Sequence, residues 1–249
     1  MNETGMAKRA LVFIAGVIIY MIFLLTNLYA IGFIANLFVP KGIDDGVRIP
    51  LAPAIFVDLA LIALFGLQHS LMARSAFKER WTRWIPRALE RSIFVLSSSL
   101  ALVFLFWQWR PIPEVVWNVP GGFMNVALNS LFWLGWVGVV AATFLIDHFD
   151  LFGLRQVYLY LRGVEYTPVP FKRPALYNYI RHPMMLAFLI AFWATPQMSF
   201  GRLIFAAGMT VVILIGIAFE EQDLLQAYGE AYDKYRRQVS MLIPMPRKK

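Results

Sequence analysis

The residues best suited to chemistry gather in the last quarter of the chain, in two charged motifs on either side of an apolar stretch. The first reads Y-N-Y-I-R-H-P over residues 177–183, and the second covers residues 220–239 and opens with two glutamates. Arg181 and His182 supply cationic groups that suit a carboxylate, whereas glutamate oxygens accept hydrogen bonds from an amine or a hydroxyl. A zwitterionic or mixed-charge cofactor would fit between the two motifs.

The first motif predicts the start of a helix. Pro183 suits the first helical position, where its missing N–H is not needed, and it holds His182 extended just before the helix. The N–H groups of Met184, Met185 and Leu186 then have no partner within the helix, and the helix dipole favours an anion beside them. We therefore expect the anionic end of a ligand at this helix start.

The second motif places carboxylates and aromatic rings at the far end of the apolar hairpin. Glu220 and Glu221 leave the hairpin together, and Tyr228, Tyr232 and Tyr235 recur at helical spacing on one stripe. The stripe predicts either one wall of the ligand site or a helix that lies on the membrane with its rings at headgroup depth. The residues alone leave both interpretations open.

The order and spacing of the two motifs carry a family resemblance. R-H-P, an apolar hairpin and then E-E-x-x-L-x-x-x-Y-G-x-x-Y-x-x-Y-x-x-x-V resemble the integral membrane methyltransferases related to isoprenylcysteine carboxyl methyltransferase. In that family these motifs bind S-adenosyl-L-methionine (S-adenosylmethionine), so the resemblance implies this cofactor. The residues that it assigns to cofactor binding are Tyr177, Arg181, His182, Pro183, Met185, Leu186, Glu220, Glu221, Tyr232 and Tyr235.

Three further motifs narrow the resemblance. Q-H-S at residues 68–70, H-F-D-L-F-G-L-R-Q-V at 148–157 and F-W-A-T-P at 192–196 resemble the bacterial methanethiol S-methyltransferases. The resemblance then covers most of the chain. It implies a small apolar thiol as substrate, with methanethiol converted to dimethyl sulfide and S-adenosylhomocysteine as the second product. It also implies a place in the bacterial inner membrane.

Methyl transfer to a thiol needs a group that takes the thiol proton, because a simple alkyl thiol is mostly protonated at neutral pH. With His182 assigned to the donor end, His69 and His148 are the candidates for this base. His69 lies in an apolar run and is the predicted base, whereas Asp147 and Asp150 favour a protonated His148 with a structural or donor-side role. Two simpler interpretations stay open: a helix-packing hydrogen bond at His69, and a solvated helix end at His148.

Membrane helices must position these residues. The chain of 249 residues is 59% hydrophobic and has a mean hydropathy of +0.62. Both values are well above those of a soluble domain. Apolar runs near the roughly 20 residues that cross the hydrocarbon core predict an all-α polytopic membrane helix bundle with a C-terminal helical hairpin and a cytoplasmic tail helix. About six transmembrane helices are expected, at residues 10–38, 52–72, 92–109, 126–146, 184–198 and 203–219.

The predicted organisation is a single methyltransferase domain over residues 1–249. Its first part, 1–146, holds four spans, and its second part, 147–249, binds the cofactor. Within the fourth span, Gly135 and Gly138 are expected to allow close helix packing. No linker or repeat indicates a second domain.

The charges and the missing cysteines exclude other classes of protein. The net charge of +8 is concentrated at the N-terminus, in residues 74–91 and 147–181 and in the tail, which predicts that both termini are cytoplasmic and that nucleic acid is not a partner. Without Cys there is no thiolate zinc site and no Cys nucleophile, and no metal site is expected. The alternatives are methylation of a lipid amine or an isoprenylcysteine-type carboxylate, an NADPH-dependent sterol-type reductase, and a small transporter or accessory protein. The sequence leaves the oligomeric state open.

Overall fold

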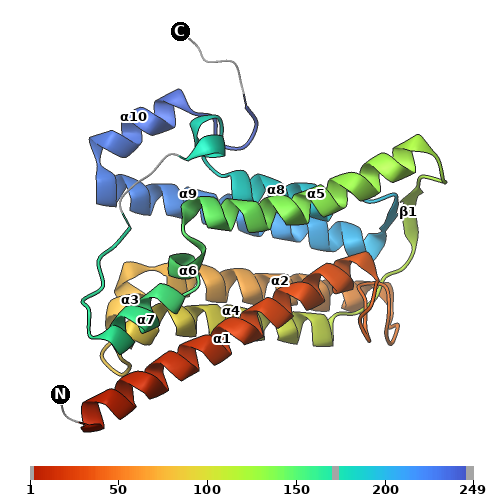
Figure 1. The fold of residues 1–249 in the computed structure, drawn as a ribbon. Helices are drawn as coiled ribbons and strands as arrows, with labels where there is room; N and C mark the ends of the chain where they lie inside the picture. The colour runs from red at the N-terminus through yellow and green to blue at the C-terminus, as the bar shows by residue number, and fades with distance from the viewer. Residues whose placement is uncertain (1–2, 170–173, 245–249) are drawn as a thin grey trace. The chain divides into compact units, whose positions relative to one another are not determined.

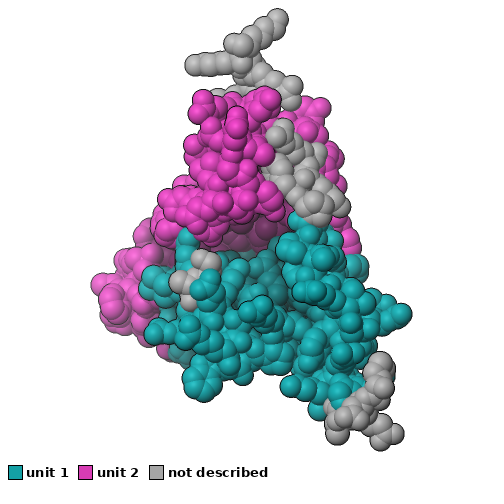
Figure 2. Space-filling model, turned by 90° about the vertical axis from the view of Figure 1, so that its left-hand side faces the viewer, with its two compact units in different colours: residues 1–42, 63–109, 147–170 teal, residues 43–62, 110–146, 171–249 magenta. Residues whose placement is uncertain are grey.

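The structure, a computed structural model, describes residues 3–169 and 174–244. The basic residues of the tail after residue 244 and a short part of the predicted 147–181 loop lie outside the described residues. The chain divides into two compact units, which Figure 2 draws in teal and magenta. The first contains residues 1–42, 63–109 and 147–170, and the second contains residues 43–62, 110–146 and 171–249.

The first unit is built on the long helix α1 (Glu3–Ala35), which packs against α4 (Glu90–Gln108) and α7 (Leu154–Arg162) (Figure 1). Gly16 permits the approach of α1 to α7, because a Cβ at this position would lie 2.6 Å from Val157 Cγ2. The other elements of this unit are the second half of α2 (Leu51–Ala73), α3 (Ser75–Trp81), the short 3-10 helix η1 (Arg87–Leu89) and α6 (His148–Leu151).

The second unit is a layer of helices in which α5 (Phe123–Ile146) packs along α8 (Pro183–Trp193). Helix α8 also contacts α9 (Phe200–Tyr228), and α9 in turn contacts α10 (Glu230–Gln238). The other elements are the first half of α2, β1 (Val115–Asn118), the 3-10 helix η2 (Ala175–Asn178) and β2 (Gln197–Ser199).

The predicted all-α membrane helix bundle is confirmed, and its long helices identify a multi-pass membrane protein. In the described residues, five helices are long and apolar enough to cross a membrane: Gly5–Ala35, Leu51–Ala73, Arg87–Gln108, Phe123–Ile146 and Phe200–Tyr228. The expected span over residues 184–198 is wrong in its length. Helix α8 has only 11 residues, or about 16 Å, against a hydrocarbon core of about 30 Å.

Helix α8 ends early because the chain enters a small antiparallel ladder that the sequence analysis did not predict. Pro196 disfavours helical geometry at the residue before it, and the Thr195 hydroxyl donates to the Gln197 carbonyl at 2.7 Å. Strand β2 then pairs with β1, with Val115 opposite Ser199. The ladder joins the loop after α4 to the turn of the C-terminal hairpin, so this turn has a fixed backbone.

Helix α9 has 29 residues and is about 44 Å long, so its last turns extend beyond a hydrocarbon core of about 30 Å. The predicted single tail helix is interrupted at Gly229. This residue has a φ of 53°, and the separate helix α10 begins directly after it. The predicted stripe of three tyrosines is therefore wrong. Tyr228 is partly exposed on α9, whereas Tyr232 and Tyr235 on α10 are buried. Their burial also contradicts the alternative in which these rings lie at headgroup depth.

The predicted close packing at Gly135 is confirmed and can be tested by filling the gap. A Cβ at Gly135 would lie 2.7 Å from the backbone nitrogen of Ala191 on α8. Gly135→Ala is therefore expected to lower the free energy of unfolding by about 1–3 kcal/mol, the usual cost of overpacking, measured by thermal or denaturant unfolding in detergent. The matched control is Gly216→Ala in α9, where an added Cβ meets no atom within 4 Å. Equal stability of the two variants would contradict the packing of α5 on α8.

Candidate functional site

The two predicted motifs of the C-terminal part meet in the second unit through the backbone. Ile180 and Ser240 form a parallel β-bridge. On either side of it, the Arg181 N–H donates to the Ser240 carbonyl at 2.8 Å and the His182 N–H donates to the Met241 carbonyl at 3.1 Å. The chain after α10 is thus tied to the segment that leads into α8.

A buried carboxylate, Glu221, joins the side chains of the two motifs. Its Oε1 accepts from Arg181 Nε at 2.7 Å and lies 3.1 Å from His182 Nε2. All three side chains are largely buried, at 10% exposure for Arg181, 5% for His182 and 13% for Glu221. Because a buried charge without a partner is costly, these contacts hold the end of α9 against the start of α8.

Arg181 also caps the helix of the tail. Its Nη1 donates to the Arg236 carbonyl at 2.9 Å and to the Val239 carbonyl, both at the C-terminal end of α10. Carbonyls at a helix C-terminus have no partner within the helix and attract cations. The Arg181 side chain therefore connects the R-H-P motif to both α9 and α10.

Glu220 differs from its neighbour in being accessible. Its side chain is 48% exposed, and its Oε2 lies 3.5 Å from His182 Nδ1. Burial by itself lowers the pKa of His182, but hydrogen bonds and charges from Glu220 and then Glu221 outweigh this and raise the pKa above its ordinary 6.5. Glu220 retains oxygen atoms that can accept hydrogen bonds from a ligand.

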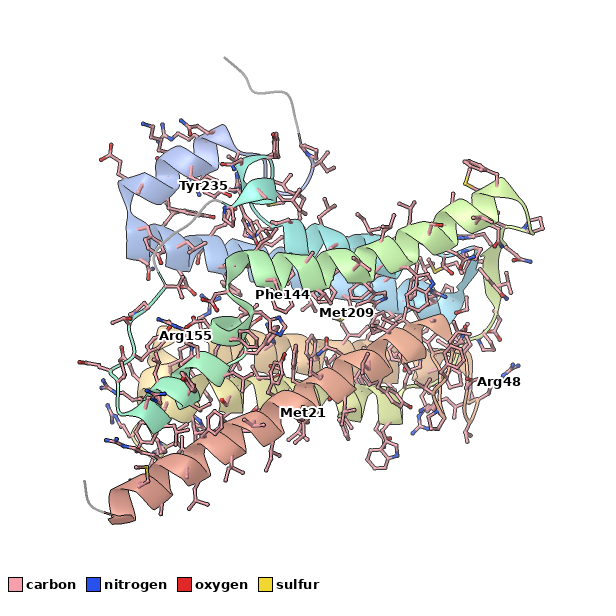
Figure 3. All side chains as sticks on the ribbon, viewed as in Figure 1. Met21, Arg48, Phe144, Arg155, Met209 and Tyr235 are labelled. Carbon is pink, nitrogen blue, oxygen red and sulfur yellow. The ribbon has the colours of Figure 1, made fainter. Side chains whose placement is uncertain are left out.

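Tyr177, Tyr232 and Tyr235 belong to the same cluster around Glu221. Tyr235 lies on the side of α10 that faces α9 (Figure 3), where it packs with Tyr232, Leu224 and Leu225. Its hydroxyl donates to the Tyr177 carbonyl at 2.7 Å. Burial, followed by the charge of Glu220, raises the pKa of the Tyr177 phenol. The phenol thus remains a neutral hydrogen-bonding group.

The start of α8 confirms one prediction made from the R-H-P motif and contradicts another. Pro183 occupies the first helical turn and His182 is its N-cap, as predicted. The N–H of Leu186, however, donates to the His182 carbonyl at 3.1 Å. The prediction of a free Leu186 N–H is therefore wrong, because this residue already completes the first turn of the helix. Met184 and Met185 lie in that first turn.

The other two histidines lie in the first unit, in unlike surroundings. His148 is buried, and its Nε2 lies 2.7 Å from the hydroxyl of Tyr20. Burial lowers the pKa of His148 and outweighs the opposing charge of Asp147. The predicted protonated form of His148 is thus wrong. Asp150 does not offset the burial, because it is paired with Arg155 on α7 at 2.8 Å.

His69 is exposed and is held by contacts on two sides. Its Nδ1 lies 3.2 Å from the Ser98 hydroxyl, and its ring lies 5.6 Å from the Phe65 ring and 5.0 Å from the Phe94 ring, centroid to centroid. The hydrogen bond at Nδ1 leaves Nε2 as the nitrogen for a further partner. Ser98 was missed from the sequence, although a polar residue in an apolar span is a usual signal of function.

The arrangement of possible metal ligands can be stated for the described residues. In residues 3–169 and 174–244, no group of three or more His, Asp or Glu side chains is placed to hold a metal ion.

The pKa order of the histidines is a direct prediction of this geometry. The chain has three histidines, so ¹⁵N-histidine labelling gives few enough signals to assign by substitution. His182 should titrate above its ordinary 6.5 and His148 below it. Because the pKa of His182 is raised, its contribution to stability is complete below 6.5 and is lost as pH rises through the raised value. Glu221→Gln should lower the His182 value and leave that of His148 unchanged. The reverse order of the two pKa values would contradict the pairing of His182 with Glu220 and Glu221.

Comparison with known proteins places the chain in a family. The family model described as NnrU protein matches residues 58–238. The chain is 51% identical over 239 residues to a methanethiol S-methyltransferase of Mycobacterium tuberculosis, covering 96% of this chain and 98% of that protein. It is 52% identical over 242 residues to a methanethiol S-methyltransferase of Crocosphaera subtropica, covering 97% and 95%.

More distant similarity reaches nurim of Sus scrofa, which is 30% identical over 190 residues, covering 73% of this chain and 70% of that protein. No solved structure matches the chain. The matched region runs from the middle of α2 to the end of α10, so it includes His69, His148 and both motifs of the Glu221 cluster. The chain therefore belongs to the NnrU protein family.

Proposed function

We propose that this protein is a membrane methyltransferase that transfers the methyl group of S-adenosylmethionine to methanethiol and releases dimethyl sulfide. The observation that carries the proposal is the identity of about half of all residues, over nearly the whole of both chains, with proteins named methanethiol S-methyltransferase. The whole chain would act as one methyltransferase domain, with residues 147–249 supplying the donor site.

The cluster around Glu221 suits the polar end of the methyl donor. S-adenosylmethionine carries a carboxylate, an ammonium group and ribose hydroxyls, and the cluster offers a cationic His182 beside the half-exposed carboxylate of Glu220. The first-turn N–H groups of Met184 and Met185 would bind the carboxylate, and the positive charge of His182 behind them would attract it. Glu220 would accept from the ammonium group or the hydroxyls.

The other residues of the cluster support this site from behind. Arg181 and Glu221 are already paired with each other at 2.7 Å, so we assign them to holding His182 and Glu220 in place. Tyr177, Tyr232 and Tyr235 would form the apolar and aromatic wall beneath, with Pro183 and Leu186 fixing the helix start. Bound there, S-adenosylmethionine supplies an electrophilic methyl group on a sulfonium sulfur.

The reaction needs alignment and one proton transfer. The thiol loses its proton, and the thiolate sulfur forms a bond to the methyl carbon as the bond from that carbon to the sulfonium sulfur breaks. The bonding electrons stay with the donor sulfur, so two opposite charges become two neutral products, a change that a water-poor site does not oppose. The chain must therefore hold the thiol within reach and accept its proton.

His69 is the base that fits this task. Ser98 fixes Nδ1 at 3.2 Å, and the rings of Phe65 and Phe94 give the imidazole an apolar setting suited to a small apolar thiol. His148, neutral and bonded to Tyr20, would instead hold α6 on α1. These roles separate the base from a structural histidine.

The sterol-type reductase alternative needs basic residues for the 2′-phosphate of NADPH. In the described part of the tail, Arg236 and Arg237 both pair with Asp233, at 3.3 and 2.8 Å. Both guanidinium groups are thus already engaged with a carboxylate within α10. We further propose that the protein lies in the bacterial inner membrane with both termini in the cytoplasm, because Lys and Arg are concentrated in residues 74–91 and 147–181. This topology needs six crossings, so α8 and the extended residues between it and α9 would together form one of them.

Headspace gas chromatography tests the proposed reaction. Membranes that contain the protein, given methanethiol and S-adenosylmethionine with a labelled methyl group, should release labelled dimethyl sulfide. Membranes without the protein, and membranes given NADPH in place of the methyl donor, are the controls. Absence of label in the volatile product, with folded protein present, would refute the assignment.

The role of His69 gives a sharper prediction in the same assay. His69→Ala should lose about 10²–10⁴-fold in turnover, the usual contribution of a general base, with unchanged affinity for S-adenosylmethionine by calorimetry. Raising the pH should restore part of the rate by supplying thiolate from solution. Ser98→Ala should lower turnover by a smaller factor, whereas its neighbour Ser97→Ala should not. Near-normal turnover of His69→Ala from pH 6 to pH 9 would exclude His69 as the base.

A further inference from the structure

The segment between α2 and α4 carries aromatic and cationic side chains that the proposed reaction does not use. Phe77 and Trp81 lie one turn apart on α3, and their rings stack with centroids 6.2 Å apart. Trp84 follows the helix and is 85% exposed. A ring so exposed is unfavourable in water but is well placed at the depth of lipid headgroups.

A turn at the end of α3 gathers these side chains around one hollow. The N–H and the hydroxyl of Thr82 both donate to the Lys78 carbonyl, each at 2.9 Å, and the Trp84 N–H donates to the Trp81 carbonyl at 3.0 Å. The chain thereby folds back at the helix end. The resulting concave surface has a volume of about 450 Å³ and is lined by Phe77, Arg80, Trp81 and Trp84.

The charge around this hollow is strongly positive. Residues 74–91 contain six Lys or Arg and two Glu. Among the side chains that the structure describes, no carboxylate lies within ion-pair distance of Arg80 or Arg83. Arg91 differs, because its Nε donates to the Leu151 carbonyl at 2.7 Å and its guanidinium lies over the Phe94 ring. Arg80 lines the hollow almost entirely with the apolar part of its side chain, so its guanidinium would meet a phosphate at the rim of the hollow.

We propose that this hollow, defined by Phe77, Arg80, Trp81 and Trp84, binds the headgroup of an anionic phospholipid. A guanidinium matches a phosphate through paired hydrogen bonds, and the three rings would cover the glycerol and the first part of the acyl chains. A free phosphate would gain nothing from the rings, so the lining favours an amphiphile over a small soluble anion. The lipid would anchor the segment between α2 and α4 at the membrane surface.

Lipid selection in nanodiscs tests this proposal without reference to enzyme activity. The full-length protein is placed in mixed phosphatidylglycerol and phosphatidylcholine, and the lipids that remain bound after mild detergent release are counted by native mass spectrometry. The wild type should retain phosphatidylglycerol in preference. Arg80→Gln should reduce this preference by about tenfold or more, because a hydrogen bond to a charged group contributes about 1.5–3 kcal/mol. Trp84→Ala should reduce the retention of both lipids.

Two matched controls separate a site from diffuse attraction. Arg87→Gln removes an exposed positive charge from the same segment but not from the hollow, and Trp107→Ala removes an exposed ring from α4. Both should behave as the wild type. Equal losses in Arg80→Gln and Arg87→Gln would overturn the proposal, because they would show attraction by the whole basic segment. Displacement of the lipid by millimolar soluble glycerol phosphate would also overturn it, by showing a site for a free phosphate group.

Discussion

The pairing of Glu221 with Arg181 and His182 is the interaction on which the C-terminal half depends. Glu221 is largely buried near the end of a membrane helix and accepts from both cationic residues, at 2.7 and 3.1 Å. Removal of one member of such a pair leaves a buried charge uncompensated, at a cost of about 3–5 kcal/mol. The pair also fixes geometry, because Arg181 reaches the last carbonyls of α10 while its own backbone N–H is bonded to Ser240. One guanidinium thus joins α8, α9 and α10.

The residues of the R-H-P motif and the two neighbouring glutamates have different roles in this arrangement. The buried members, Arg181 and Glu221, hold the cluster together. The accessible member, Glu220, remains for the ligand, and the buried histidine between the two carboxylates would supply positive charge beside it. The same division appears in the first unit, where buried His148 bonds to Tyr20 and exposed His69 is oriented by Ser98. In both places a buried polar pair is structural and an exposed neighbour carries the proposed chemistry.

The parts that the sequence predicted well are those set by local rules. Apolar runs of sufficient length located the long helices, and Pro183 located the start of α8, because proline fits only the first turn. The meeting of the two motifs followed from their positions at the ends of one hairpin. The family resemblance then connected them to a methyl donor.

The parts that the sequence did not predict depend on tertiary contacts. The β1–β2 ladder needs two segments about 80 residues apart in the chain, and the early end of α8 follows from it. The positive φ at Gly229 separates Tyr228 from Tyr232 and Tyr235, although their spacing alone fits one helix. Local charge suggested a protonated His148, but burial, which a sequence does not show, has the larger effect.

Hydrogen–deuterium exchange with and without S-adenosylhomocysteine tests the central claim most directly, because it locates the ligand without requiring turnover. Saturating ligand, confirmed by calorimetry, should slow the exchange of backbone amides in residues 177–186 and 229–241, which surround the Glu221 cluster, and leave those of α3 unchanged. Saturating binding with no added protection in either of these two segments would contradict a donor site built on Arg181, His182, Glu220 and Glu221.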